Sequence, residues 1–292
     1  MRIKLGKMGV FCFSSGMNAA QVAAFARKVE DLGYAAYWFP EARGGDESFA
    51  LAAYLLCHTT KLQVGTGIAN IYARDGVTAR LGLHTLSRLS GNRFILGLGV
   101  AHPDNVEKTR GHQFGKPVPT MRAYLDLMDS VLGNATHVDA QPHIVLAALG
   151  PLMTKLAVQR TDGVLPYNVT PEHTAWARER IGADPWLGVE QKVLLLQDAT
   201  KARAVARKSL APYMPMYHYR NAWQRLGFSD DDLANGGSDR FLDGMVAWGD
   251  EAAIRKRVQA HFDAGADHVC IQPLHPEGKP IPDERVVEAL AP

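Results

Sequence analysis

The sequence predicts a (β/α)8 barrel formed by one domain that spans residues 1–292. Two observations indicate this fold. Eight apolar segments of strand length alternate with segments whose apolar residues recur at helical spacing. Segments 31–39 and 263–271 nearly repeat each other, since both read as a helix end, a glycine and a strand. A doubly wound open sheet would require a glycine-rich fingerprint after its first strand, and residues 13–16 do not provide one.

The predicted strands are short runs of apolar, β-branched and aromatic residues. In chain order they cover residues 7–13, 34–40, a run beginning at Leu62, a run beginning at Arg93, 142–148, 164–169, 191–197 and 267–273. Between Leu62 and Asn105 the chain holds two strand-to-loop junctions separated by a helix, about the length that a parallel crossover needs. Because parallel strands of a barrel end on the same side, we expect the functional site at that rim.

The predicted helices are bounded by residues with well-understood capping roles. Asn18 can cap the first helix, and Gly33 and Gly91 can supply the left-handed residue that ends a helix. Pro151 and Pro171 suit the first turn of the helices that they open. The helices are expected at residues 19–32, about 47–59, 77–90, 120–132, 151–159, from 171, 200 to about 211, and 250–264.

Three segments depart from the alternation of strands and helices. A long polar segment follows Asn105, and such a segment in a compact domain is usually functional or mobile. A polar linker is expected to end at Gln141. Residues 213–237 are rich in aromatic side chains and look helical. We interpret about 212–244 as a helical insertion that precedes the last strand and packs near the barrel top.

Composition and charge favour a protein that acts on a small molecule. The chain is 47% hydrophobic and 21% charged, and its formal net charge of +2 includes no basic stripe that would indicate nucleic-acid binding. Cys12, Cys57 and Cys270 lie in apolar settings without metal or redox spacing, which favours buried thiols in a reducing cytoplasm. Neither a signal-peptide core nor a membrane-spanning apolar run is seen, so we expect a cytoplasmic protein without a membrane partner.

Four motifs in this order carry a family resemblance. They are GTGIAN at 65–70, NRFILGLGVAHPDN at 92–105, VLAALGP at 145–151 and AGADHVCIQ at 264–272. Over nearly its full length the chain resembles the luciferase-like flavin and deazaflavin oxidoreductases, and more narrowly their coenzyme F420-dependent branch. The resemblance implies a luciferase-like TIM barrel that transfers hydride between F420 and a small organic substrate. Relatives are commonly dimeric, so a homodimer is expected.

The resemblance also implies which residues bind the cofactor. The family has a non-prolyl cis peptide against the central ring of the cofactor, which falls here between Gly67 and Ile68. Asn70 would offer its amide to the ring edge. The remaining implied contacts are Val100, Ala101 and Asn105 after the fourth strand, and Leu149, Gly150, Leu152 and Met153 near the phosphate-bearing tail.

Two side chains are predicted to manage the proton that accompanies hydride transfer. His102 matches the position of a catalytic glutamate in sugar-phosphate dehydrogenases of the family, and Glu41 matches an acidic residue beside the ring. Those relatives place a histidine where this chain has Ala42, so their acid–base pair and their sugar substrate do not carry over. Lesser candidates are His112, Tyr167, Asn168, Tyr217 and Tyr219.

Three alternatives remain open from the sequence. The first is an FMN-dependent monooxygenase or reductase on the same barrel, whose relatives often place a hydroxyl and an arginine around the phosphate. No hydroxyl occurs between Leu149 and Thr154, which favours F420. The second is a metal-dependent hydrolase, although no HxH motif follows the first strand and we predict no metal site. The third is a barrel that binds flavin without catalysis.

Overall fold

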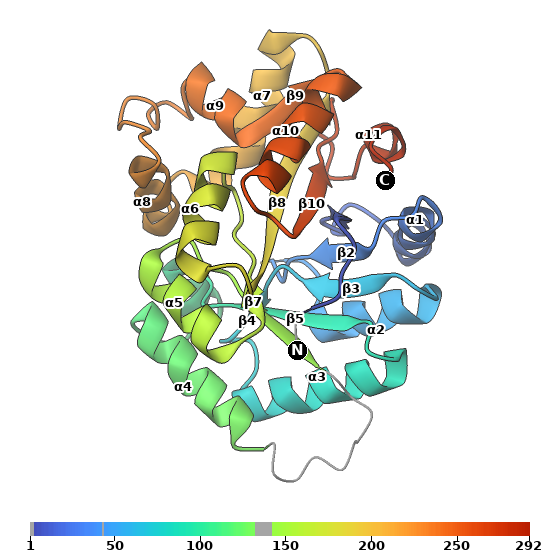
Figure 1. Ribbon diagram of the computed structural model, residues 1–292, viewed down its shortest axis with the longest axis vertical. Coiled ribbons are helices and arrows are strands. Elements are labelled where there is room, and N and C mark those ends of the chain that lie inside the picture. The colour runs from blue at the N-terminus through green and yellow to red at the C-terminus, as the bar shows by residue number, and fades with distance from the viewer. Residues whose placement is uncertain (1–2, 43, 132–141) are drawn as a thin grey trace.

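Eight parallel strands close into a barrel in the computed structural model, which describes residues 3–42, 44–131 and 142–292 (Figure 1). Neighbouring strands pair in chain order around the ring, and the barrel closes where the last strand pairs with both the first strand and β8. The ring strands are β1 (Met8–Phe11), β2 (Ala36–Phe39), β3 (Gln63–Thr66), β5 (Phe94–Gly99), β6 (His143–Leu146), β7 (Gly163–Val164), β8 (Trp186–Leu195) and β10 (His268–Pro273). The predicted luciferase-like TIM-barrel fold is confirmed.

Two further strands lie outside the ring. β4 (Ala69–Asn70) pairs with the end of β5 after a break in the third strand. β9 (Val246–Gly249) pairs with the far end of β8. Neither was predicted as a separate strand.

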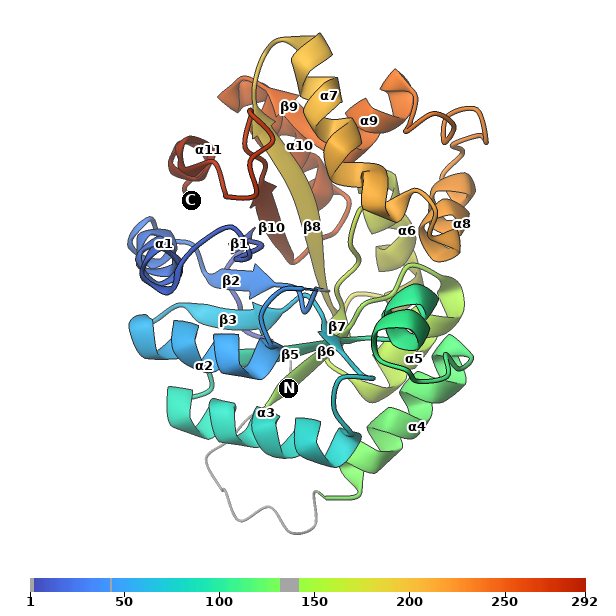
Figure 2. The ribbon, with the colours of Figure 1, turned by 180° about the vertical axis from the view of Figure 1, so that it is seen from behind.

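The helices surround the barrel and follow its strands (Figures 1 and 2). The predicted caps are confirmed, since Asn18 forms a complete capping box and Gly91 ends its helix with φ of 65°. The helices that cover the barrel are α1 (Ala19–Asp31), α2 (Ser48–His58), α3 (Gly76–Ser90), α4 (Pro117–Asp129), α5 (Pro151–Arg160), α6 (Pro171–Ile181), α7 (Ala199–Leu210), α10 (Glu251–Asp263) and α11 (Glu284–Ala289).

Two strand boundaries and one cysteine differ from the prediction. The sixth strand ends at Val164 instead of residue 169, because Pro166 has no N–H to continue the ladder. The seventh strand begins at Trp186 instead of residue 191, and its early part was missed because Glu190 interrupts the apolar run. Cys57 is exposed instead of buried, since it lies off the packed face of α2.

The segment after Asn105 and the linker have different outcomes. Residues Asn105–Thr109 form a π-helix, a rare form that often occurs at functional sites. α4 then begins at Pro117, earlier than predicted, because a proline suits the first helical turn. The expected polar linker that ends at Gln141 lies outside the described residues.

The predicted helical insertion is present between β8 and β10. It contains a 3-10 turn, η3 (Ala211–Tyr213), and the helices α8 (Tyr217–Arg225) and α9 (Asp239–Met245). Trp223 and Phe241 pack edge to face in its buried cluster, with ring centroids 4.8 Å apart. Both views place α8 beside the barrel helices α5 and α6 (Figures 1 and 2).

The inside of the barrel is filled by side chains from alternate strand positions. Trp38 and Trp186 stack there, and the Trp38 indole N–H donates to His268 Nε2 at 3.0 Å. Burial lowers the pKa of His268 to about 4, so this layer is uncharged at neutral pH. The next inner positions of β8 toward the C-terminal rim hold the charged residues Glu190 and Lys192.

Among the described residues, no helix combines the length and apolar character needed to span a membrane.

Candidate functional site

A cavity of about 640 Å³ opens at the C-terminal rim of the barrel. Its walls come from the ends of β1, β2, β3, β5, β7 and β8, together with residues of the insertion. A volume of this size is typical of a site for a small organic molecule or cofactor. The sequence-predicted residues that line it are Glu41, Gly67, Ile68, Asn70, Ala101, His102 and Asn105.

The break between β3 and β4 forms one wall of the cavity. The peptide bond between Gly67 and Ile68 is cis, as the family resemblance implied. The N–H of Gly67 donates to the Phe39 carbonyl at 2.7 Å, and the Ile68 carbonyl accepts the N–H of Glu41 at 3.1 Å. A Cβ on Gly67 would lie 2.6 Å from the ring of Phe11, so only glycine fits without a shift of that ring.

Two asparagines from neighbouring strand ends meet beside this break. Asn70 Nδ2 donates to Asn105 Oδ1 at 3.3 Å, and Asn70 Oδ1 accepts the Tyr72 N–H at 2.9 Å. Asn70 is only 2% exposed, so its amide is fixed before any ligand arrives. These contacts present two oriented amide groups at the cavity wall, as expected for recognition of a polar ring edge.

Glu41 is held in place by neighbouring groups and faces the cavity only in part. Its carboxylate forms a salt bridge with Arg74, which also pairs with Glu47. The backbone N–H of Asn70 donates to the same carboxylate at 2.7 Å. These partners fix the orientation of the Glu41 carboxylate, which favours a positioning role.

His102 lies against a second histidine that the sequence analysis did not identify. Its ring stacks on that of His218, with centroids 4.5 Å apart and planes 7° apart. Burial lowers the pKa of His102, and burial together with the charge of His102 lowers that of His218 to about 4. His102 Nδ1 is buried and has no hydrogen-bond partner. At neutral pH the site therefore presents a neutral imidazole beside the cavity.

Five of the predicted cofactor contacts lie outside the cavity lining. Val100, which follows β5, packs partly on the core. The four residues expected near the phosphate-bearing tail lie at the start of α5: Leu152 is exposed, Gly150 is the N-cap residue, and Leu149 and Met153 pack partly on the core. Arg225 of the insertion donates to the Leu149 carbonyl at 2.8 Å, which places a guanidinium at this helix start. The sequence analysis missed Arg225, since nothing in the local pattern of α8 connects it with α5.

The wall on the β7 and β8 side is built from buried polar side chains. Glu190 lines the cavity, and Lys192 lies directly behind it with its ammonium 3.3 Å from the Glu190 carboxylate. Tyr167 and Asn168, two lesser candidates of the sequence analysis, both contact Lys192. Glu190 and Lys192 themselves were missed, because a charged pair inside a strand gives no motif.

His112, Tyr217 and Tyr219 complete the lesser candidates. Tyr219 lines the cavity, and its ring lies 6.0 Å from that of His102. His112 lies against the ring of Tyr72, and Tyr217 is half-exposed on α8; neither belongs to the cavity lining.

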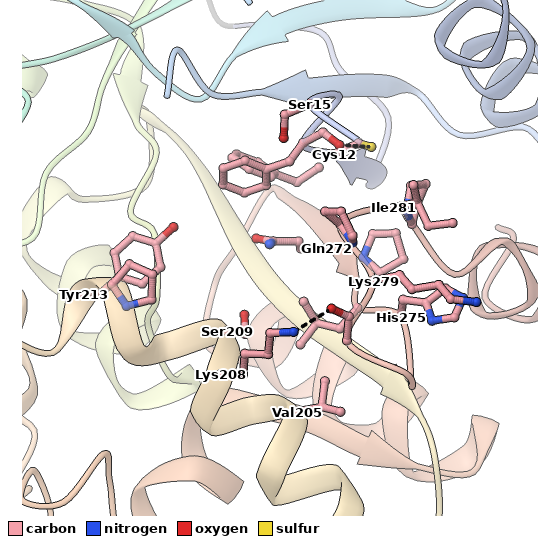
Figure 3. A pocket seen from close by; sticks show the side chains of 18 residues that line it. Cys12, Ser15, Val205, Lys208, Ser209, Tyr213, Gln272, His275, Lys279 and Ile281 are labelled. Carbon is pink, nitrogen blue, oxygen red and sulfur yellow. Dashed lines mark hydrogen bonds between the residues drawn. The ribbon is translucent and has the colours of Figure 1, made fainter. Parts of the chain in front are cut away.

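A smaller pocket of about 360 Å³ adjoins the cavity (Figure 3). Phe11, Phe13 and Tyr213 belong to the walls of both spaces, and Gln272 extends toward the middle of the smaller one. Lys208 closes its outer side by donating to the Gly278 carbonyl at 3.1 Å. The two spaces therefore share part of their walls, and this shared part includes Tyr213 of the insertion.

No three His, Cys, Asp or Glu side chains gather in a geometry that could hold a metal ion, within the part of the chain that the structure describes.

Fold and cavity together define a (β/α)8-barrel enzyme whose site lies at the carboxyl ends of its strands. The chain belongs to the luciferase-like monooxygenase family, whose sequence profile matches residues 7–268. It is therefore an enzyme of the oxidoreductase class.

Individual relatives support the same assignment. A Mycobacterium tuberculosis protein whose name proposes coenzyme F420-dependent oxidoreductase activity is 26% identical over 330 residues, covering 90% of this chain and 93% of the relative. An F420-dependent secondary alcohol dehydrogenase, solved with an F420-acetone adduct, has a TM-score of 0.75 at 14% identity, covering 99% and 97% of the two chains. The 3,6-diketocamphane monooxygenase component of Pseudomonas putida, solved with FMN, has a TM-score of 0.69 at 14% identity, covering 98% and 96%. At such identities the two structures show the shared fold.

Proposed function

We propose that this enzyme transfers hydride between the deazaflavin coenzyme F420 and a small organic substrate. The observation that supports it most is the preformed wall at Ile68, Asn70 and Asn105, which offers an apolar face beside two fixed amides. A flat ring with a polar edge fits such a surface, and about 640 Å³ leaves room for a substrate beside it. The names of the F420-dependent relatives agree with this choice.

The start of α5 fits the phosphate-bearing tail of the cofactor. Because Pro151 has no N–H, the donors there without an intrahelical acceptor are those of Leu152 and Met153. A Cβ on Gly150 would meet only the Arg225 guanidinium at 3.6 Å, so the approach to the backbone is open. Helix N-terminal donors and a guanidinium both favour an anion.

The residues of the chain would bind and orient the cofactor and would exchange one proton with the substrate. Bound F420 supplies hydride chemistry at its central ring. Ile68 and Ala101 would support the ring, and Asn70 with Asn105 would fix its edge. Neutral His102 lines the cavity and can accept a proton from a substrate hydroxyl, while Glu41 holds the Asn70 backbone in place.

The second candidate is an FMN-dependent monooxygenase or reductase. FMN relatives often place arginine near the phosphate, so Arg225 at the start of α5 suits this candidate as well as the F420 tail. The FMN-bound neighbour also shares the fold. A homodimer and a small-molecule substrate remain part of the proposal for either cofactor.

Titration of the purified protein with F420 and, separately, with FMN tests the choice, with cofactor fluorescence as the readout. We expect F420 to bind roughly tenfold or more tightly than FMN, a difference of about 1.4 kcal/mol or more. Tight FMN binding without F420 binding would overturn the F420 assignment and leave the FMN enzyme. Binding of neither would contradict both candidates.

A further inference from the structure

We propose that Glu190 is a catalytic acid on the substrate side of the cavity, that Lys192 positions it, and that the substrate is a neutral unsaturated carbonyl compound. This inference rests on the proposed hydride transfer, specifies its substrate side, and assigns the proton transfer to Glu190 in place of His102. Glu190 and Lys192 belong to neither the predicted cofactor contacts nor the predicted catalytic residues.

The topology of the barrel places Glu190 opposite the cofactor wall. In the ring order β1-β2-β3-β5-β6-β7-β8-β10, β3 and β8 are four positions apart, so they face each other across the barrel. Ile68 follows β3 and Glu190 lies on β8, and both line the cavity. A ring that rests on Ile68 would therefore turn its other face toward Glu190, with the substrate between them.

Contacts to both of its oxygens hold the Glu190 carboxyl in one orientation. One oxygen accepts the Asn168 backbone N–H at 3.2 Å, and the other lies 3.3 Å from Lys192 Nζ. Lys192 in turn donates to Asn168 Oδ1 and lies 4.0 Å from the ring centroid of Tyr167. Both charged side chains are no more than 2% exposed, yet only Glu190 belongs to the cavity lining.

A purely structural role explains this pair poorly. Moving two charges out of water usually costs more than their attraction returns, and apolar residues of similar volume are often as stable. Phe11 of β1, Val145 of β6 and Leu165 after β7 are apolar residues near this layer, and the in-register neighbour of Lys192 on β10 is the neutral Gln272. Burial raises the pKa of Glu190 and lowers that of Lys192, so burial favours the protonated carboxyl over the carboxylate.

The proton and electrons balance in the reductive direction. Bound reduced F420 would supply the hydride, and with it two electrons, to the electrophilic carbon of the substrate. The Glu190 proton goes to the oxygen of the carbonyl group, or of its enolate if hydride enters a conjugated carbon. The Glu190 carboxylate that remains is stabilised by the Lys192 ammonium and regains a proton from water after product release.

The charges of the cavity lining argue against an anionic substrate. Within the described residues, the lining contains four carboxylates and neither lysine nor arginine: Glu41, Asp46, Asp104 and Glu190. Each has a partner, namely Arg74, the Ser14 hydroxyl, Lys108 and Lys192. Among the lining residues that the structure describes, a phosphate or carboxylate group would find neither lysine nor arginine, whereas Phe11, Tyr213 and Tyr219 suit a neutral, planar molecule.

The test compares wild-type protein with Glu190→Gln, and uses Glu277→Gln as a matched change at an exposed glutamate. The probes are cyclohex-2-enone and its anionic analogue 3-oxocyclohex-1-ene-1-carboxylate. F420 affinity is measured first by fluorescence, and oxidation of reduced F420 then gives kcat and KM across pH. We expect Glu190→Gln to bind F420 within about twofold of wild type and to lose about 100-fold in kcat with the enone.

The pH profile separates proton transfer from a structural effect. As a required acid, Glu190 must be protonated, so wild-type kcat should fall as the pH rises through its pKa. That basic limb should disappear in Glu190→Gln. In Lys192→Met it should move to higher pH, because removal of a nearby positive charge raises a carboxyl pKa. If Glu190→Gln does not fold, the same measurements are made on the double variant Glu190→Gln/Lys192→Met, in which both charges are removed.

Each outcome decides between the proposals. Failure of wild-type protein to bind F420 contradicts the proposed function itself. If Glu190→Gln binds F420 normally, and its kcat and the fall of kcat at high pH are both unchanged, the role of Glu190 is overturned. His102 then remains as the proton carrier. Reduction of the anionic analogue in preference to cyclohex-2-enone, or of neither probe by F420-loaded wild type, overturns the proposed substrate class.

Discussion

The two walls of the cavity are built by different physical means. The wall at Ile68, Asn70 and Asn105 is shaped by the backbone. It contains a cis peptide bond, the glycine Gly67 whose Cβ position is occupied by the Phe11 ring, and the short pairing of β4 with β5. The opposite wall at Glu190 and Lys192 is shaped by side chains that are buried, charged and paired. Backbone-shaped walls leave glycine and asparagine motifs in a sequence, whereas a buried ion pair leaves none.

The largest expected effect breaks the side-chain wall. At a pH where Glu190 is ionised, Lys192→Met leaves a buried carboxylate without its cation and should lower the free energy of unfolding by about 3–5 kcal/mol. The double variant Glu190→Gln/Lys192→Met should recover most of this loss, because no unpaired charge remains. Urea unfolding of wild type, both single variants and the double variant measures the coupling. Additive losses would show that the pair does not act as one unit.

The next largest effect on stability is expected from protonation of His268, in the uncharged layer beneath both walls. His268 is buried, and its pKa falls from 6.5 to about 4 on folding, so the unfolded state binds more protons between these values. The contribution of neutral His268 to the free energy of unfolding is about 3 kcal/mol. It is fully present above pH 6.5 and is lost as the pH falls through about 4.

His268→Gln should therefore make the acid side of the stability profile shallower, as measured by urea unfolding between pH 4 and 7. His173 and His261, whose burial also lowers their pKa values, retain the rest of the slope. An unchanged slope in His268→Gln would contradict a neutral buried His268.

A smaller effect is expected when the backbone-shaped wall is crowded. Gly67→Ala places a Cβ 2.6 Å from the Phe11 ring, which must shift, and should cost about 1–3 kcal/mol of stability. Cofactor affinity should fall by roughly tenfold or more, because the same wall supports the ring. Gly82→Ala, in α3, also places a Cβ 2.6 Å from an aromatic ring, that of Phe49 outside the cavity lining, and is the matched control. Wild-type affinity in Gly67→Ala would remove this wall from the cofactor site.

The smallest expected effect concerns the start of α5. Arg225→Gln keeps a donor for the Leu149 carbonyl but removes the charge, and should weaken cofactor binding by a few-fold, about 1 kcal/mol. Because the interaction is electrostatic and partly exposed, the loss should shrink in high salt. Isothermal titration at two salt concentrations measures both quantities, and an effect independent of salt would contradict a charge-based role.

The sequence predicted the barrel and its rim because both follow from repeated local patterns. Alternating strands and helices, capping at Asn18 and Gly91, and the GTGIAN motif each reflect a local backbone requirement. The seven predicted residues that do line the cavity follow three strand ends, where the order of junctions gave the signal.

The missed residues share a different cause. His218 and Arg225 reach the site from the insertion, and their partners His102 and Leu149 are more than 70 positions away in the chain. Glu190 and Lys192 occupy inner positions of a strand whose charged residues made its first half unrecognisable. Only the closed barrel shows that these side chains face the same space.

The most direct measurement is a crystal structure of the protein with bound F420. The account predicts that the deazaflavin ring contacts Ile68, that its edge meets the Asn70 and Asn105 amides, and that its free face is turned toward Glu190. A ring that stacks on Tyr167 or Tyr213 and covers Glu190, with an empty wall at Ile68, would contradict it.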